Sequence, residues 1–428
     1  MAMMRYLWIG TVAVGVGAAL AGPGIAQADT ESGRNGTNQG TNQTAASADS
    51  PGKSARPARG VHRSARTSSR SVSAPPAAIP PASAAINPRS TGALIGPSPA
   101  APVAPVTRYR VANPIPPRQQ WNANYGYCGE TSFISAGLNY GQYMSQYDAR
   151  ALASKNIRQS LPASQLLLGV NDVAAAKAMR LTAVPFNTAQ QTTTTQFLTW
   201  TKTHVTAGNP VIMGVFTNER RFYGTTDPNA GDPEYDHIVT ATGISSTRPL
   251  TAPAAYYPDD IITFTDNGLW TGTPNGLPQY VFSYALGSFA ATRRQANAAN
   301  GPVYSLSNGK DYGIAITGVA DLNKETVRVR LTTSAIGESP AIANGSSTRP
   351  ASKPVTLTIT MSGLTPGKTY NLYRYASMAT VPDSNFNANS AKAAQKWRIV
   401  ATGTTYTMTQ TIMSNETAAY RAVPVTAR

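Results

Sequence analysis

Residues 29–116 of this 428-residue chain show neither the helical nor the strand period of apolar side chains. The segment is rich in Ser, Thr, Ala, Pro, Asn, Gly and Arg. Such a composition buries too little apolar surface to offset the entropy lost when a chain becomes ordered. We therefore expect a disordered linker over residues 29–116 and folded structure from residue 117 onward.

Residues 1–28 have the pattern of a secretory signal peptide. Arg5 supplies the positive start, residues 7–21 are small and apolar, and Ala26-Gln27-Ala28 forms a cleavage site. An N-terminal membrane anchor is the alternative, but the apolar run is short and a good cleavage site follows it. We expect a secreted protein, extracellular or cell-wall associated, with no integral membrane segment after removal of the signal.

The chain carries a formal net charge of +16, and a basic run lies in the expected linker. We interpret this run as a solvated tether, with contact to an acidic cell-wall polymer or membrane surface as the sharper alternative. Nucleic-acid binding is not expected, because no aromatic residues interleave with these arginines. The run consists of Arg56, Arg59, His62, Arg63, Arg66 and Arg70.

Cys128 is the one cysteine of the chain, so no intramolecular disulfide can form. In an exported protein, an unpaired cysteine is a buried apolar side chain, an intermolecular link or a reactive thiol. Apolar residues recur at three- and four-residue steps after Cys128, which predicts that a helix begins there. A helix N-terminus favours the thiolate, and Gly129 would let a substrate backbone come close.

A thiol nucleophile needs a base, and two histidines lie beyond the linker. His204 follows a helical pattern and looks like a helix-end residue near the surface. His237 opens the strand pattern HIVTATGI, and the next strand pattern ends in Asp266-Asn267. Neighbouring strands can bring the imidazole beside a carboxylate or an amide that holds its tautomer. Both Asp266 and Asn267 are candidates for that role.

The ordered set of residues resembles the papain-like cysteine peptidase fold, in its C39-like branch, over about residues 118–295. The resemblance implies that Cys128 is the nucleophile and His237 the general base. It also implies that Asp266 orients the base and that Gln120 donates to the oxyanion, with Asn267 and Gln119 as the respective alternatives. The matching segments are Gln120, Tyr127-Cys128-Gly129, Asp236-His237-Ile238-Val239, Thr242-Gly243 and Thr263-Phe264-Thr265-Asp266.

The resemblance implies an α+β fold class, with a papain-like (C39-like) domain at residues 117–300. From residue 301 the pattern changes to short alternating strands divided by turns, which predicts an antiparallel β-sandwich over residues 301–428. Residues 364–370 there are similar to a fibronectin type III corner. We expect this region to be a stability or spacer module, or to bind substrate, glycan or a partner by its loops.

The sequence favours a secreted cysteine hydrolase that cleaves peptide or isopeptide bonds through an acyl-enzyme. One alternative is a catalytically silent papain-fold scaffold that acts with its β-sandwich in surface binding or adhesion, and another is acyl transfer. The expected partner is a peptide or protein substrate.

No cofactor or metal is expected, because one cysteine and two separated histidines make no familiar zinc ligand set. An acidic loop precedes His237 and lacks the ligand spacing of an EF-hand calcium site, so we interpret it as solvated. Its acidic residues are Asp227, Asp232, Glu234 and Asp236.

Overall fold

The computed structural model describes residues 108–224, 235–290, 298–306 and 310–425, and all of these belong to one compact unit, Ala58–Arg428. The expected signal peptide, most of the expected linker, and Asp227, Asp232 and Glu234 lie outside the described residues. Within the described ranges, no helix is long and apolar enough to cross a membrane.

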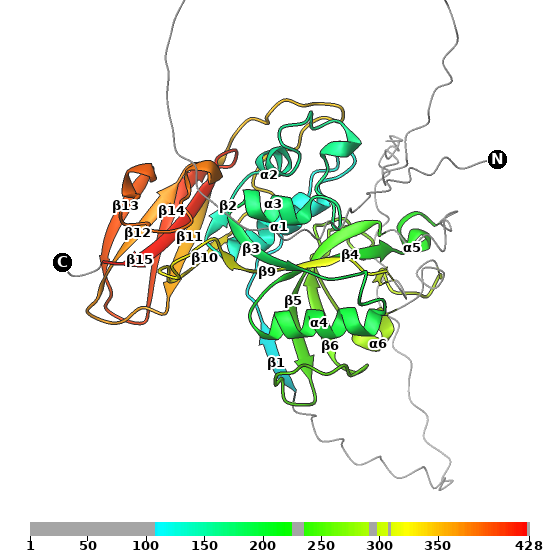
Figure 1. The fold of residues 1–428 in the computed structure, drawn as a ribbon. Helices are drawn as coiled ribbons and strands as arrows, with labels where there is room; N and C mark the ends of the chain where they lie inside the picture. The colour runs from blue at the N-terminus through cyan, green and yellow to red at the C-terminus, as the bar shows by residue number, and fades with distance from the viewer. Residues whose placement is uncertain (1–107, 225–234, 291–297, 307–309, 426–428) are drawn as a thin grey trace, which may run out of the picture. The chain divides into compact units, whose positions relative to one another are not determined.

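The largest element is an eight-stranded sheet in which every pairing is antiparallel (Figure 1). Its strands are β1 (Tyr109–Ala112), β3 (Leu181–Pro185), β4 (Val211–Thr217), β5 (His237–Ser246), β6 (Ile261–Thr265), β7 (Val281–Ala285), β8 (Tyr304–Ser305) and β9 (Gly313–Val319). The main path runs β3-β9-β4-β5-β6-β7, while β1 pairs with β5 and β8 pairs with β4. All seven residues of β4 are buried, as expected of a central strand covered on both faces.

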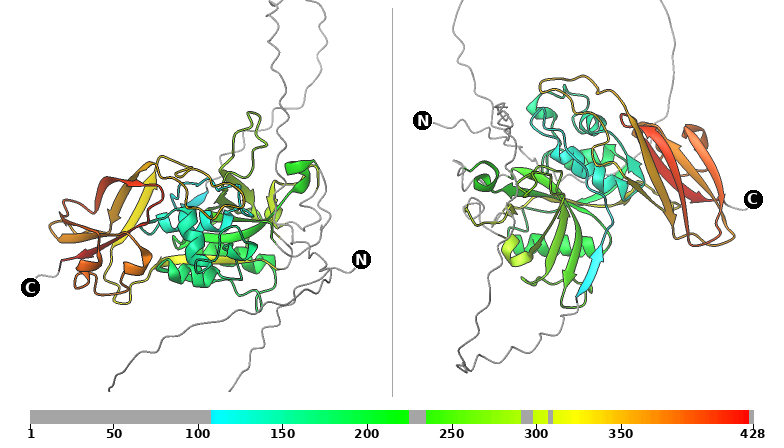
Figure 2. Two further views of the ribbon diagram at one scale, coloured as in Figure 1. Left: turned by 90° about the horizontal axis from the view of Figure 1, so that it is seen from above. Right: turned by 180° about the vertical axis from the view of Figure 1, so that it is seen from behind.

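Short helices cover both faces of this sheet, as the views in Figures 1 and 2 show. Alternate strand residues point to opposite faces. Ile238 packs into the core cluster with α1 and α3, whereas its neighbour Val239 packs into the cluster with α4 and α6. The helices are α1 (Cys128–Leu138), α2 (Gln146–Ala153), α3 (Asp172–Ala178), α4 (Thr194–Thr206), α5 (Glu219–Tyr223) and α6 (Leu286–Phe289), with 3₁₀ turns η1 (Pro162–Ser164), η2 (Met378–Thr380) and η3 (Ser390–Lys392).

Two smaller antiparallel sheets follow. One has the order β10-β11-β14, formed by β10 (Arg328–Thr333), β11 (Pro354–Ser362) and β14 (Thr405–Met413). The other has the order β13-β12-β15-β2, formed by β13 (Gln395–Val400), β12 (Thr369–Tyr375), β15 (Ala418–Pro424) and β2 (Gln142–Tyr143). Leu357 of the first and Leu372 of the second share one apolar core. At the expected corner, the backbone N–H of Thr365 donates to the Tyr370 hydroxyl at 2.9 Å.

The expected α+β, papain-like fold class is wrong. The described chain is β-rich: helix makes up only 19% of it, in six short helices, and its sheets are antiparallel. The individual strand patterns and the helix at Cys128 are present as predicted. The few residues that carry the resemblance do not specify a scaffold, because similar sites occur on unrelated folds.

The predicted boundaries also need correction. Strand β1 lies inside the expected linker, because Tyr109 and Val111 pair with Ser246 and Ile244 of β5. Strand β9 was expected to open the C-terminal sandwich, but it lies between β3 and β4 in the larger sheet. Strand β2, from before residue 300, belongs to a C-terminal sheet. The sheets therefore do not separate at residue 300.

Candidate active site

Cys128 is the first residue of α1, as predicted, and it is the partly exposed residue of a helix whose other residues are all buried. The first residues of a helix have backbone N–H groups without intrahelical partners. The thiol therefore lies where free N–H groups and the helix dipole stabilise a negative charge. The residue packs against the core cluster but is not sealed within it.

The backbone that leads into Cys128 has an unusual conformation. Asn124, Tyr125 and Gly126 have positive φ angles of 49°, 68° and 86°, a region that costs energy for residues other than glycine. Three carbonyl contacts hold it. Arg150 donates to the carbonyl of Asn124 at 2.9 Å and to that of Gly126, and Gln165 Nε2 donates to the carbonyl of Tyr125 at 2.7 Å.

The Arg150 side chain is held by burial, by an ion pair and by an aromatic ring. Its side chain is fully buried, its Nε lies 2.6 Å from Glu130 Oε1, and its guanidinium lies 3.5 Å from the centre of the Tyr127 ring. Glu130 Oε1 also accepts the backbone N–H of Leu166 at 3.0 Å. The loop before the cysteine is therefore held by a buried ion pair inside the protein.

His237 begins β5 and Asp266 directly follows β6, two strands that pair antiparallel. His237 Nε2 lies 2.8 Å from Asp266 Oδ1, and the histidine is only 2% exposed. Burial lowers the pKa of His237, but the hydrogen bonds and charges of Asp266 and Cys128 raise it to about 9. The structure thus brings together the predicted Cys128, His237 and Asp266.

The Asp266 carboxylate is held by further donors. Its Oδ1 accepts the Tyr304 hydroxyl at 3.0 Å, and its Oδ2 accepts the backbone N–H groups of Leu269 at 3.0 Å and Trp270 at 3.3 Å. The Tyr304 ring also stacks on the His237 ring at 5.7 Å. Burial and the Asp266 charge raise the pKa of Tyr304, so it remains a neutral donor. Sequence analysis missed Tyr304, since it lies in a two-residue strand with no motif.

Asn267, the alternative orienting residue, has another role. Its Nδ2 donates to the carbonyl of Cys128 at 3.0 Å, to the carbonyl of Ile238 at 2.9 Å and to Ser132 Oγ at 3.2 Å. The amide therefore ties the start of α1 to the start of β5. Asp266, not Asn267, contacts the imidazole.

The two glutamines before the cysteine lie differently. Gln120 is 7% exposed, its backbone N–H donates to the Asn267 carbonyl at 2.9 Å, and its Oε1 has no hydrogen-bond partner among the described residues. Gln119 is exposed and its Oε1 lies against Gly337. Asn267 therefore links the backbone of Gln120 to Cys128 and to the loop that holds Asp266.

Gly129 is needed for packing inside the protein, whereas the sequence predicted that it would let a substrate backbone come close. A Cβ at this position would lie 2.0 Å from the carbonyl oxygen of Leu166 and 3.2 Å from Ile238 Cδ1. The residue is buried. Glycine is therefore required so that the chain's own backbone at Leu166 can pack against the helix, rather than to admit a substrate.

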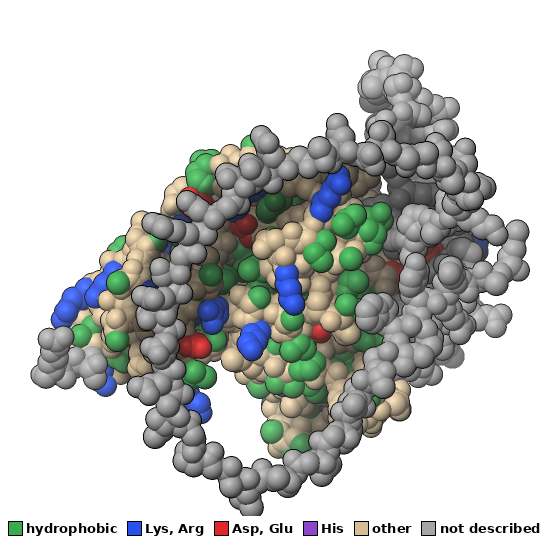
Figure 3. Space-filling view, turned by 45° about the horizontal axis from the view of Figure 1, so that its top comes forward, with side chains coloured by type: hydrophobic (Ala, Val, Ile, Leu, Met, Phe, Trp, Pro, Cys, Tyr) green, Lys and Arg blue, Asp and Glu red, His purple; other side chains and the backbone are tan. Residues whose placement is uncertain are grey.

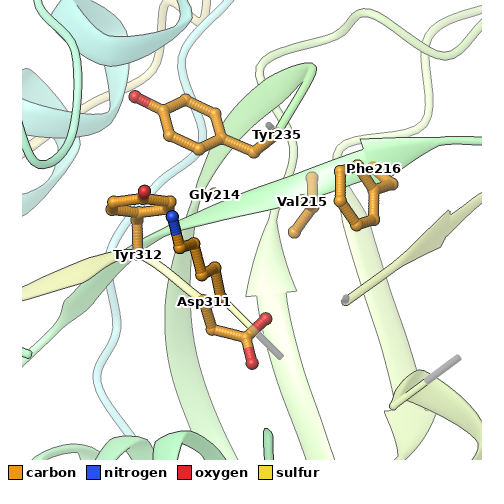
Figure 4. Close-up of a pocket in the computed structure, with 7 residues that line it drawn as sticks. Gly214, Val215, Phe216, Tyr235, Asp311 and Tyr312 are labelled. Atoms are coloured by element: carbon orange, nitrogen blue, oxygen red, sulfur yellow. The ribbon is translucent and has the colours of Figure 1, made fainter. Parts of the chain in front are cut away.

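A small pocket lies along β4, the strand next to His237 (Figure 4). Val215 pairs directly with His237 in the sheet register. The Tyr235 ring covers Gly214, where a Cβ would come within 2.6 Å of it, and the Tyr235 hydroxyl donates to the Leu168 carbonyl at 3.0 Å. Figure 4 shows the Tyr235 and Tyr312 rings on the same side of this strand. The centroids of these two rings lie 5.6 Å apart, so an aromatic pair forms part of the pocket lining.

The distribution of Lys and Arg side chains does not by itself identify the candidate active site. On the face drawn in Figure 3, Lys and Arg side chains lie apart from one another over much of the described surface. His204 lies in the last turn of α4 beside Trp200, and burial lowers its pKa. The described ranges hold no cluster of three His, Cys, Asp or Glu residues that could bind a metal ion.

No protein-family model, curated protein or solved structure matches this chain.

Proposed function

We propose that the chain is a cysteine hydrolase that cleaves peptide or isopeptide bonds through Cys128, His237 and Asp266, with Gln120 as an oxyanion donor. The observation that carries the proposal is the buried His237 ring, which bonds Asp266 at 2.8 Å through Nε2 and whose pKa is raised by both Asp266 and Cys128. This is the nucleophile–base–orienter arrangement of covalent acyl transfer. The N-terminal sequence supports an exported enzyme.

The resting site fits a protonated imidazole at His237. A His237 pKa of about 9 keeps the ring protonated at neutral pH, and the N-terminus of α1 favours the negative sulfur. A protonated imidazole suits amide substrates in particular, because an amine leaving group must receive a proton as the C–N bond breaks. This argument supports peptide or isopeptide bonds as the substrate class.

The proposed reaction proceeds in two halves. Cys128 Sγ attacks the carbonyl carbon, and the oxyanion that forms accepts hydrogen bonds from the Cys128 N–H and the Gln120 amide. His237 gives its proton to the departing nitrogen, leaving a thioester on Cys128. His237 then takes a proton from water as the water attacks the thioester, which releases the carboxylic acid and restores the thiolate.

Iodoacetamide labelling at neutral pH tests the proposal cleanly, because Cys128 is the one cysteine in the chain. Wild type should label quickly, and His237→Ala at least about ten times more slowly, since general-base partners typically contribute 10²–10⁴-fold. His204→Ala is the matched control, because it removes the other described histidine, on α4. It should label at the wild-type rate.

Equal and slow labelling of wild type and His237→Ala would contradict the proposal. That result would favour a scaffold without chemistry. If labelling behaves as expected, incubation with a peptide mixture and an added amine separates hydrolysis from acyl transfer, because transfer would give amine-linked products.

A further inference from the structure

The connection between β10 and β11, residues 334–353, contacts the segment that precedes the cysteine. The Arg118 guanidinium donates to the Ala335 carbonyl and pairs with Glu338, and both charged side chains are buried. The next residue, Gln119, donates its backbone N–H to the Ile336 carbonyl at 3.1 Å. This connection therefore holds the backbone immediately before Gln120.

The β10–β11 connection also forms hydrogen bonds to the start of the loop with positive φ angles, residues 124–126. The backbone N–H of Asn124 donates to Asn344 Oδ1 at 3.0 Å. In return, Asn124 Oδ1 accepts the Gly345 N–H at 2.7 Å, and Asn124 Nδ2 donates to the Ser346 carbonyl at 2.8 Å. Only three residues lie between Asn124 and Cys128, so these bonds act close to the cysteine.

Apolar contact reinforces the hydrogen bonds. Ile342, from the middle of the connection, is 8% exposed and packs in a small core of its own with Trp121, Ala123 and Tyr127. Tyr127 is the residue that caps α1. The connection thus reaches the cap of the cysteine helix as well as the loop before it.

The other end of the cysteine helix is also tied to the C-terminal sheets. The backbone N–H of Tyr420 in β15 donates to the Gly141 carbonyl at 2.7 Å, and Arg330 Nε in β10 donates to Asn139 Oδ1 at 3.0 Å. Leu138, the last residue of α1, lies in the core shared by the two small sheets. Both ends of the helix are therefore fixed by the same region.

We infer that the β10–β11 connection sets the position of Cys128 and Gln120, and that Asn344 is a positioning residue for the thiol. The inference rests on the proposed function and assigns the C-terminal sheets a part in the chemistry. Asn124 and Tyr125 adopt positive φ angles that are unfavourable without external contacts. Asn344 supplies an acceptor for the first of them while its own side chain is exposed.

The test compares Asn344→Ala with its conservative partner Asn344→Asp in the full chain. Asn344→Ala should lower the iodoacetamide labelling rate of Cys128 about 3- to 10-fold, because small misplacements of reacting groups are costly. Asn344→Asp should restore it, since a carboxylate oxygen also accepts from the Asn124 N–H. Thr348→Ala, at an exposed position of the same connection, should match wild type. Near-UV circular dichroism of each variant checks the fold.

A second variant, Asn124→Gly, tests the same contact from the other side. Glycine tolerates the positive φ but removes the side-chain bonds to Gly345 and Ser346, so labelling should again slow. Wild-type labelling by Asn344→Ala and Asn124→Gly would overturn the inference, as would failure of Asn344→Asp to restore the rate. If His237→Ala also labels like wild type, the proposed function fails and the positioning role fails with it. A slow His237→Ala beside a wild-type Asn344→Ala contradicts the positioning role alone.

Discussion

His237 Nε2 and Asp266 Oδ1 lie 2.8 Å apart although 29 residues separate them in the sequence. The two side chains are 2% and 0% exposed, so water does not compete for this hydrogen bond. Because three more donors hold the carboxylate, Asp266 fixes the ring orientation rather than following it.

Asp266→Asn keeps the size of the side chain and removes its charge. Without that charge, the opposing effect of burial weighs more, so the pKa of His237 should fall below its wild-type value of about 9. The imidazole titration measured by NMR should show this change, and labelling of Cys128 should slow by at least about tenfold. Asp259→Asn, in an exposed ion pair with Arg248, is the control. An unchanged His237 titration would contradict the assignment.

The free energy of unfolding should depend on pH through His237. Its pKa is about 9 in the folded state against the ordinary 6.5, so the folded state binds the proton more tightly. The added stability is therefore full below pH 6.5 and is lost as the pH rises through 9. At about 1.4 kcal/mol per pKa unit, it amounts to roughly 3 kcal/mol.

Urea denaturation between pH 6 and 9.5 measures this effect in wild type and His237→Gln. The wild-type free energy of unfolding should fall over this range, and the variant should show a flatter curve. Parallel curves for the two proteins would refute the link to His237.

Asn267→Ala should destabilise the fold by about 2–4 kcal/mol, because the carbonyls of Cys128 and Ile238 and the Ser132 hydroxyl each lose one buried hydrogen bond, although Ser132 still donates to Ile238. The His237 titration should stay near 9, which separates this residue from Asp266. Urea denaturation gives the stability, with the exposed Asn300→Ala as control. A large change in the His237 titration would instead support Asn267 as the residue that orients the imidazole.

Gln120→Ala should separate two reactions of the same sulfur. Acylation by p-nitrophenyl acetate passes through an oxyanion, whereas alkylation by iodoacetamide does not. We expect acylation to slow about 10²–10³-fold, the usual effect of losing an oxyanion donor, while alkylation changes little. Gln119→Ala is the matched control, because Gln119 is exposed. Equal losses in both reactions would argue for a structural role of Gln120.

Gly129→Ala should unfold or severely destabilise the protein, by more than about 3 kcal/mol, because its Cβ would overlap the Leu166 carbonyl at 2.0 Å. Gly403→Ala is the control, since nothing lies within 4 Å of a Cβ there. Thermal unfolding followed by circular dichroism measures both. A stable Gly129→Ala with slow substrate turnover would instead support the earlier idea of substrate approach at this glycine.

The sequence contained enough information to predict the start of α1 at Cys128 and the strands at His237 and before Asp266. In each case the signal was local: apolar steps of three and four for the helix, and β-branched runs for the strands. Because the two strands pair as neighbours, local signals also predicted that His237 would meet Asp266.

The remaining features depend on contacts between distant residues, which leave no local pattern. Tyr304 reaches Asp266 from a two-residue strand, and Asn344 reaches Asn124 across 220 residues. The strand β9 carried a correct local pattern, but its place between β3 and β4 could not be inferred from it. The expected fold class failed for the same reason, since motifs around a site do not specify strand order.

Strand β9 has a practical consequence for dividing the molecule. A chain cut after residue 300 would lose β8, β9 and Tyr304 from the larger sheet, and it would expose Leu138 and Tyr143, which are buried in the C-terminal core. We therefore expect the two regions to unfold in a single cooperative transition. We also expect neither region to fold when it is cut at that junction and fused to another protein.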